Sequence, residues 1–263
     1  MWDQLAANVF RRRYDFLDVN IGLVVGAAGA LLVDSRCSAA EGAELAHDVA
    51  SVTDRPVRWV VNTHWHWDHV FGNGSFPDAT IWGHAAAADR LRAEGESAVA
   101  DARRWFPEER RAELEEFTIS PPGAVFTSNV ELDVGGLVVA LRYRGRGHTD
   151  GDIVVHVGDV LFAGDLVEES APPFFGDGYP LAWPGTLAGH LGSTGTVVPG
   201  HGDVMTAGDA ASQLAELEAV AAVCRRAVAE GATANAADLN GSPYPEATMR
   251  SAVARALLEA SAD

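Results

Sequence analysis

Lysine is absent from this 263-residue chain: all 19 basic residues are arginine, against 37 aspartates and glutamates. The formal net charge is −18 at pH 7, and a surface of that sign repels nucleic-acid phosphates and anionic membranes. The absence also excludes a lysine nucleophile and a lysine anchor for a substrate carboxylate. We therefore expect a small-molecule substrate, with no nucleic acid and no membrane as partner, while a homo-oligomer stays open.

Cysteines and long apolar runs are also scarce. Cys37 and Cys224 lack metal-type spacing, which excludes a zinc finger and predicts two free buried thiols. No apolar run approaches the length of a membrane span. The N-terminal stretch Met1–Leu5 is followed by three arginines and lacks the apolar block of a secretory signal, so we expect a cytoplasmic protein.

The composition is that of a globular protein, with 48% hydrophobic residues and no break that marks a second domain. We therefore expect a single domain over residues 1–263, with a helical insertion at about 94–118 and C-terminal helices at about 210–261. A strand, a helix and a strand form a predicted βαβ unit near the N-terminus, at 30–34, 38–52 and 57–62. Further strands are predicted at 18–26, 136–143, 153–157, 160–162 and 196–199.

The segment that follows the strand at 57–62 contains the pattern His-x-His-x-Asp-His. Imidazole and carboxylate are the ligands that divalent zinc, iron and manganese accept when thiolates are absent. Residues two apart in an extended segment face the same side, so His64 and His66 can bind one ion. Asp68 and His69 follow a turn of the chain and can face a second ion.

Three more candidate ligands follow predicted strands and have glycine neighbours. They are His148 in Gly-His-Thr, Asp165 in Gly-Asp and His201 in Gly-His-Gly. Glycine lets the backbone turn sharply and brings such side chains together. Five of the nine histidines therefore belong to loops at strand ends, which indicates one shared metal site.

Taken in this order, the four motifs resemble those of the metallo-β-lactamase superfamily, from about Asn20 to His201. The resemblance implies an α/β fold, a four-layered αββα sandwich with the metal site at one edge of the sheets. It also implies that Asp165 bridges two ions and that Asp34 supports the ligand loop from behind. The implied ligands are His64, His66 and His148 for the first ion and Asp68, His69 and His201 for the second.

Such a site implies a hydrolase with two Zn²⁺ ions per chain, in which a water shared by the ions loses a proton near neutral pH and becomes the nucleophile. Asp68 and Asp165 are the expected catalytic residues. The β-lactamases of the superfamily usually carry cysteine or serine where Asp165 stands. A bridging aspartate looks more like the glyoxalase II and lactonase branches, which predicts a small ester, thioester, lactone or amide as substrate.

Three alternatives remain open from the sequence. A persulfide dioxygenase with one Fe²⁺ resembles this motif on the same fold, a β-lactamase is the second alternative, and a catalytically silent binding module is the third. The segment after Asp165 offers Phe175 and Tyr179 as residues that would line the substrate pocket. An equally supported alternative is that the aromatic residues of this segment only pack against the rest of the protein.

Overall fold

In a computed structural model that describes residues 1–115, 118–192 and 194–262, the strands form two sheets. The seven-stranded sheet has the spatial order β1 (Asp3–Ala6), β2 (Val9–Arg13), β3 (Asn20–Val25), β4 (Ala30–Val33), β5 (Val57–Val61), β6 (Thr80–His84) and β7 (Ala124–Phe126). The six-stranded sheet has the order β13 (Met205–Thr206), β12 (Thr196–Pro199), β11 (Val160–Gly164), β10 (Ile153–Val157), β9 (Val138–Tyr143) and β8 (Asn129–Asp133).

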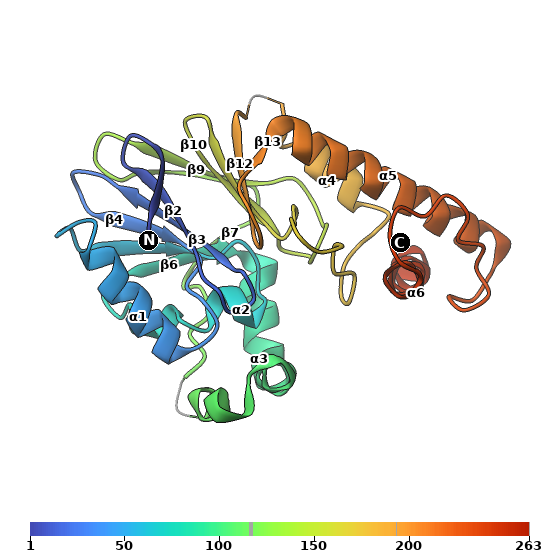
Figure 1. Ribbon diagram of the computed structural model, residues 1–263, viewed down its shortest axis with the longest axis horizontal. Helices are drawn as coiled ribbons and strands as arrows, with labels where there is room; N and C mark the ends of the chain where they lie inside the picture. The colour runs from blue at the N-terminus through green and yellow to red at the C-terminus, as the bar shows by residue number, and fades with distance from the viewer. Residues whose placement is uncertain (116–117, 193, 263) are drawn as a thin grey trace.

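Helices cover the outer face of each sheet (Figure 1). On the first sheet lie α1 (Ala39–Ala50) and α3 (Ala85–Trp105), with the single turn α2 (Trp67–Val70) and the 3₁₀ turns η1 (Asn73–Ser75) and η2 (Glu108–Leu114) beside them. On the second sheet lie α4 (Trp183–Ala188) and α5 (Ala207–Glu230), and α6 (Glu246–Ala262) packs against α5. The predicted four-layered αββα sandwich is confirmed.

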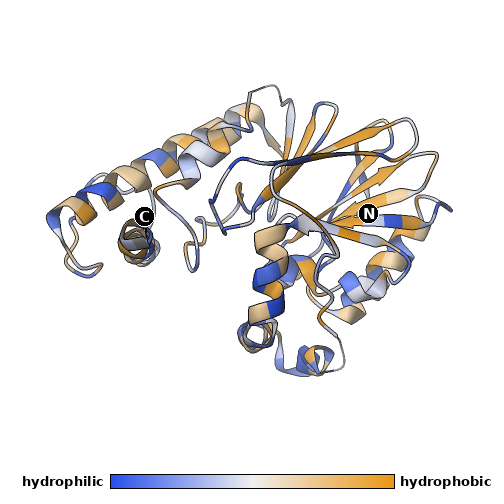
Figure 2. Ribbon diagram, turned by 180° about the vertical axis from the view of Figure 1, so that it is seen from behind, coloured by the Kyte–Doolittle hydropathy of each residue, from blue (hydrophilic) through white to orange (hydrophobic). Residues whose placement is uncertain are grey.

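One apolar layer lies between the two sheets, where hydrophobic colour is concentrated on the strands (Figure 2). Leu31 and Val33 of β4 pack there with Leu141, Val155 and Phe162 of the second sheet, and each is at most 3% exposed. Burying one such side chain stabilises the fold by about 1.5–3 kcal/mol. All residues of β4 and β11 are buried, which explains why both strands are continuous apolar runs in the sequence.

The strand directions bring the ligand loops to one edge. β4 and β5 are parallel, as are β11 and β12, so the carboxyl ends of each pair lie side by side. Asp34 and His64 follow the first pair, and Asp165 and His201 follow the second. An isolated bridge between Val19 and His201 connects the two sheets at this edge. Loops at the carboxyl ends of parallel strands are the usual position of a site in such sheets.

The helical segment expected at 94–118 begins earlier than predicted, because α3 runs without a break from Ala85 and is followed by η2. The predicted segment also includes Phe117, which lies outside the described residues. The short strands β1, β2, β7 and β8 were not predicted, because none of them has a long apolar alternation. Among the described residues, no helix combines the length and the apolar composition needed to cross a membrane.

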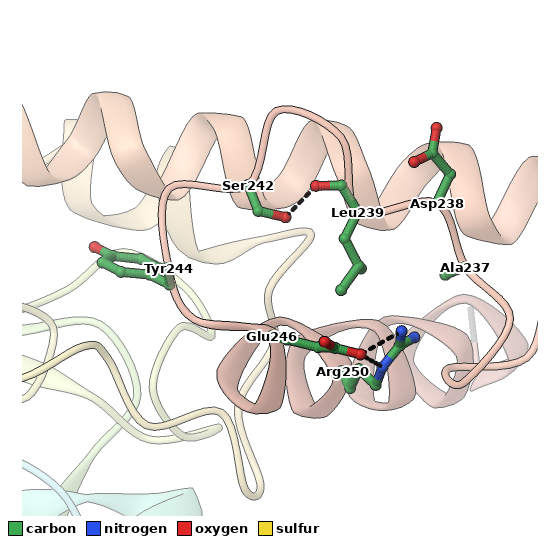
Figure 3. A pocket seen from close by; sticks show the side chains of 7 residues that line it. All are labelled: Ala237, Asp238, Leu239, Ser242, Tyr244, Glu246 and Arg250. Atoms are coloured by element: carbon green, nitrogen blue, oxygen red, sulfur yellow. Dashed lines mark hydrogen bonds and ion pairs between the residues drawn. The ribbon is translucent and has the colours of Figure 1, made fainter.

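A cavity of about 320 Å³ lies between the α5–α6 connection and α6 (Figure 3). Its polar side chains already have partners: Arg250 pairs with Glu246, and the Tyr244 hydroxyl donates to Glu216. No candidate metal ligand lines this cavity, whose lining residues are Ala237, Asp238, Leu239, Ser242, Tyr244, Glu246 and Arg250.

Candidate metal centre

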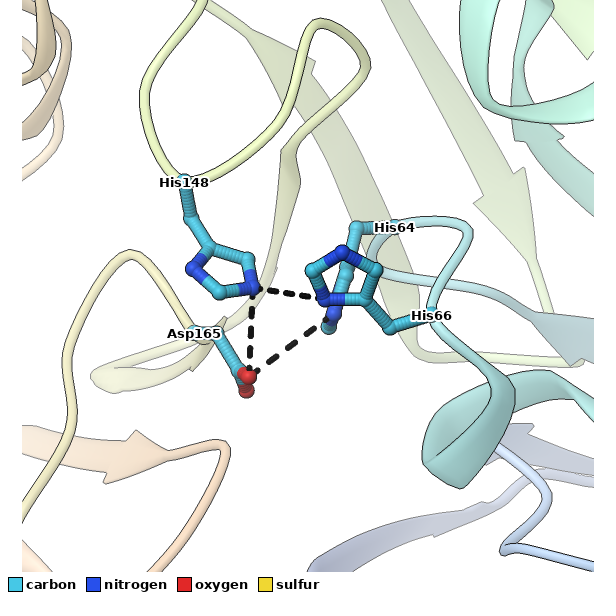
Figure 4. Close-up of side chains that lie close together, drawn as sticks. All are labelled: His64, His66, His148 and Asp165. Carbon is cyan, nitrogen blue, oxygen red and sulfur yellow. Dashed lines mark hydrogen bonds and ion pairs between the residues drawn. The ribbon is translucent and has the colours of Figure 1, made fainter. Parts of the chain in front are cut away.

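Seven metal-competent side chains gather at the edge where the strand ends meet, and they are the seven expected from the sequence. They form a first group and a second group, and within each group one ligand atom per residue lies within 4.8 Å of the others. Figure 4 shows the side chains of the first group pointing toward one another. The first group is His64, His66, His148 and Asp165, and the second group is Asp68, His69 and His201.

The Asp165 carboxylate joins the two groups. Its Oδ2 lies 3.4 Å from the Nε2 atom of His148 in the first group and 3.4 Å from that of His201 in the second. Its Oδ1 lies 3.2 Å from His69 Nε2. Only 6% of Asp165 is exposed, so its oxygens face the groups rather than solvent.

Outer hydrogen bonds fix the rings of the second group. His69 Nδ1 donates to Asp34 Oδ2 at 2.9 Å, and His201 Nδ1 donates to the Leu17 carbonyl at 2.7 Å. Since the proton of each neutral ring is held by its outer nitrogen, Nε2 keeps a lone pair that faces the centre. Asp34 therefore has the supporting position expected for it.

The same arrangement orients two rings of the first group. The Thr63 hydroxyl donates to Asp34, so its oxygen can accept from His64 Nδ1 at 3.0 Å. His66 Nε2 donates to Asp177 Oδ1 at 3.0 Å, which leaves His66 Nδ1 facing inward. His64 and His66 thus offer different nitrogens to the centre, each with a free lone pair.

The ring nitrogens and the carboxylate oxygen that face the centre without a hydrogen-bond donor are suited to bind a cation. His66 Nδ1 lies 2.8 Å from His148 Nε2, and His69 Nε2 lies 3.2 Å from His201 Nε2. In neutral rings these pairs bring lone pairs face to face, an arrangement that a shared positive ion stabilises. His64 Nε2 and Asp165 Oδ1 are buried with no hydrogen-bond partner among the described residues. Imidazole and carboxylate donors without thiolate suit a divalent zinc, iron or manganese ion.

The electrostatics of the centre also favour a cation. Burial lowers the pKa of His64, and it lowers that of His148 to about 4, so both rings stay neutral and able to ligate. Burial works against protonation of His69 and His201 as well, but the nearby carboxylates, Asp165 first, raise the pKa of both. The negative potential that binds protons in the second group equally attracts a metal ion.

Two expected pocket residues have different positions. Phe175 is only 1% exposed and packs edge-on against Trp183 in the core, so the expectation that it contacts substrate is wrong. Its neighbour Phe174 is 54% exposed and lies 6.3 Å, between ring centroids, from both His66 and His148. Tyr179 is half-buried beside the His148 loop, and its backbone N–H donates to the Gly147 carbonyl at 2.7 Å.

Sequence reasoning missed Asp177. Its carboxylate accepts from His66 Nε2 and, at 3.1 Å, from Trp65 Nε1. Burial opposes its charged form, but the adjacent His66 holds the pKa of Asp177 well below its usual value. Its position between Gly176 and Gly178 is the same glycine context that singled out Asp165 and His201, and that signal could have found it.

A family model of the metallo-beta-lactamase superfamily matches residues 14–224, which include all seven candidate ligands. The chain belongs to this superfamily. A metallo-beta-lactamase type 2 from Bacillus cereus is 30% identical over 192 residues, which cover 70% of this chain and 67% of that protein.

Solved structures of the superfamily show the same fold. A metallo-beta-lactamase from Pontibacter korlensis matches with a TM-score of 0.65 at 18% identity, covering 83% of this chain and 98% of that one. One from Erythrobacter litoralis matches with a TM-score of 0.63 at 19% identity, covering 82% and 95%. Helix α6 begins at Glu246, beyond the residues that the family model matches.

Proposed function

We propose that this superfamily member is a dinuclear metal-dependent hydrolase, with zinc as its metal, that acts on a small ester, thioester, lactone or amide. The observation that carries the proposal is the position of Asp165, whose two oxygens lie within 3.7 Å of ligand nitrogens from both groups. A carboxylate in that position suits a bridging role between two ions.

In this proposal His64, His66 and His148 hold one ion, Asp68, His69 and His201 hold the other, and Asp165 contacts both. The two ions would supply a water deprotonated near neutral pH and Lewis-acid polarisation of the substrate carbonyl. Asp68 Oδ2 lies 3.3 Å from His201 Nε2. Burial opposes the charge on Asp68, but His69 and His201 lower its pKa to about 2, so it remains a carboxylate that can ligate and orient water.

Two features of the chain support a small substrate. The exposed ring of Phe174 offers an apolar surface for an acyl or leaving group. The surface charge of the chain, −18 in total, disfavours large polyanions. We therefore propose a small-molecule substrate, with no nucleic-acid or membrane partner.

Elemental analysis of the purified protein tests the metal content. About two zinc ions per chain would support the hydrolase, whereas about one iron per chain would support the persulfide dioxygenase that the motif also resembles. A panel of thioester, lactone, ester and amide substrates then tests the chemistry. A fully zinc-loaded protein that turns over none of them would overturn the proposed function.

A β-lactamase is the second candidate, favoured by the 30% identity to the Bacillus cereus enzyme. The aspartate at position 165 argues against it, because the β-lactamases of the superfamily usually have cysteine or serine there. Adding penicillin and cephalosporin substrates to the panel separates the two candidates. A kcat/KM for a β-lactam above that for every other acyl substrate would replace the first proposal with the second.

A further inference from the structure

Helix α6 lies outside the part of the chain that the family model matches, yet it contacts the loop that carries Asp177. We call residues 173–182, between β11 and α4, the Asp177 loop. Arg255 of α6 donates from Nε to the Gly178 carbonyl at 3.0 Å and from Nη2 to the Asp177 carbonyl at 3.1 Å. One guanidinium thus satisfies two consecutive carbonyls of an irregular segment.

One turn later on α6, Glu259 accepts two backbone N–H groups of the same loop. Its Oε2 accepts from Leu181 at 2.9 Å and its Oε1 accepts from Ala182 at 3.1 Å. Glu259 is 4% exposed, so these bonds form away from bulk water. The four bonds from Arg255 and Glu259 are charge-assisted and join residues 77 or 78 positions apart in the sequence.

The Asp177 loop in turn contacts the first ligand group. Asp177 accepts from His66 Nε2 and from Trp65 Nε1, so its carboxylate orients the His66 ring. Phe174 of the same loop lies beside the rings of His66 and His148. An unbroken series of contacts therefore runs from α6 through the backbone of Asp177 to one proposed metal ligand.

Among the described residues, the outer hydrogen bonds that orient the His69 and His201 rings do not come from α6 or from the Asp177 loop. His69 is held by Asp34 at the end of β4, and His201 is held by the carbonyl of Leu17 near the start of β3. These outer partners come from the first sheet, on the opposite side of the molecule from α6 (Figure 1). A change in α6 should therefore reach the first group and leave the second unchanged.

We infer that α6 is a clamp for the first ligand group, in which Arg255 and Glu259 are positioning residues that hold Asp177 against His66 and Phe174 beside the centre. This inference rests on the metal role proposed for His66. It extends that proposal, because α6 lies outside the family match and would adjust only one of the two metal sites. Arg255 and Glu259 touch neither the proposed ligands nor the reacting atoms.

The test uses the full-length protein with Arg255→Met, with Glu259→Gln as a second variant. Arg250→Met is the matched control, because Arg250 also lies on α6 and also donates to a backbone carbonyl, that of Ala234, outside the Asp177 loop. Proton NMR of the imidazole N–H groups gives a readout independent of activity. The His66 Nε2–H signal reports the bond to Asp177, and the His69 Nδ1–H signal is the internal control.

In Arg255→Met and in Glu259→Gln we expect the His66 Nε2–H to exchange faster with solvent, while the His69 Nδ1–H is unchanged. Chelator competition should show a weaker metal affinity at one site only, by at most about tenfold, the low end of the range for outer partners of metal ligands. The Arg250→Met control should match the unaltered protein in both measurements. Asp177→Ala should weaken the same site by more, about 10–100-fold.

A double variant, Arg255→Met with Asp177→Ala, separates a clamp from a general loss of stability. If Arg255 acts through Asp177, the double variant should have the metal affinity of Asp177→Ala alone. Additive losses, an unchanged His66 signal in both α6 variants, or equal changes at His69 would overturn the clamp. Absence of metal binding by the unaltered protein would instead overturn the proposed function, so the two failures are distinguishable.

Discussion

The first ligand group depends on loops, whereas the second is attached to buried strands. His66 is oriented by Asp177 from an irregular segment, and His148 Nδ1 has no hydrogen-bond partner among the described residues. In the second group, by contrast, the loop of His201 is bonded to β3, where Asn20 Nδ2 donates to the carbonyls of Pro199 and Gly202. Preorganised ligands bind metal more tightly, so we expect the second group to fill first.

Buried charge reinforces the support of the second group. Arg11 of β2 is 6% exposed and donates to both the Asn20 side chain and the Gly202 carbonyl. No residue of the described chain gives the His148 ring a comparable outer partner. We therefore expect the ligands of the second ion to be held rigidly, whereas the ligands of the first ion can be adjusted through the Asp177 loop.

Removing the residue common to both groups should have the largest effect. Asp165→Ala should lower metal content below two ions per chain and reduce kcat/KM on the order of 10³-fold, because the proposed bridge is lost. Metal analysis and steady-state kinetics measure both quantities. Full occupancy of both sites in this variant would show that Asp165 bridges nothing.

Asp34 contacts His69 of the second group directly and His64 of the first group only through Thr63, so its removal tests the support of the second group most strongly. Asp34 is only 2% exposed, and Asp34→Ala leaves the N–H and the hydroxyl of Thr63 and the ring N–H of His69 without their acceptor. We expect a loss of about 1–3 kcal/mol or more in the free energy of unfolding, measured by denaturant titration. Metal affinity should fall about 10–100-fold at the second site, where His69 loses its acceptor, and by less at the first site, where Asp34 acts on His64 through Thr63. A loss confined to the first site would contradict the assignment of the groups.

Phe174 and Phe175 form a matched pair of test positions, because Phe174 is expected to line the substrate pocket whereas Phe175 lies in the core. Phe174→Ala should raise KM by about tenfold with little change in stability, because it removes an exposed apolar wall. Phe175→Ala should instead reduce the free energy of unfolding by about 3–5 kcal/mol, since that ring is buried against Trp183. Kinetics and thermal unfolding of both variants should give opposite patterns, and identical patterns would refute the distinction.

The smallest expected effect is the change of the metal-free protein's stability with pH. The pKa values of His69 and His201 are raised well above 6.5, because neighbouring carboxylates outweigh burial. The folded state therefore binds their protons more tightly than the unfolded chain. This contribution to stability is complete below about pH 6.5 and is lost as pH rises through the raised pKa values.

Metal should reverse that trend, because metal binding and protonation compete for the same nitrogens. We expect the metal-free protein to lose stability as pH rises above about 6.5, and the zinc-loaded protein to keep or gain stability over the same range. Unfolding curves of both forms across this range measure the difference. Parallel pH profiles for the two forms would argue against metal ligation by the second group.

The candidate ligands could be predicted because they stand in short local motifs, whereas the sandwich was predicted from the resemblance of those motifs to the superfamily. His64, His66, Asp68 and His69 stand in one short loop, and Asp165 and His201 directly follow apolar strands. In the structure, the parallel pairs β4–β5 and β11–β12 align their carboxyl ends, and this alignment brings the ligands together.

Its glycine neighbours mark Asp177 as a candidate, but the contact of Asp177 with His66 could not be predicted in this way. Asp177 is 111 residues from His66 in the sequence, and Arg255 is a further 78 away, so only tertiary packing brings them together. Phe174 and Phe175 are adjacent in a loop without periodicity, and nothing in the sequence indicates which of them faces the site. Strand-end motifs therefore predict the ligands, while the loops that orient them emerge only in the folded chain.

A crystal structure of the zinc-loaded protein, with an anomalous difference map at the zinc edge, tests the two-metal centre most directly. We predict two peaks about 3.5–4 Å apart, one on each side of the Asp165 carboxylate. At less than one equivalent of zinc, the peak beside His69 and His201 should be the stronger. A single peak at full loading, or a second ion away from Asp165, would contradict the account.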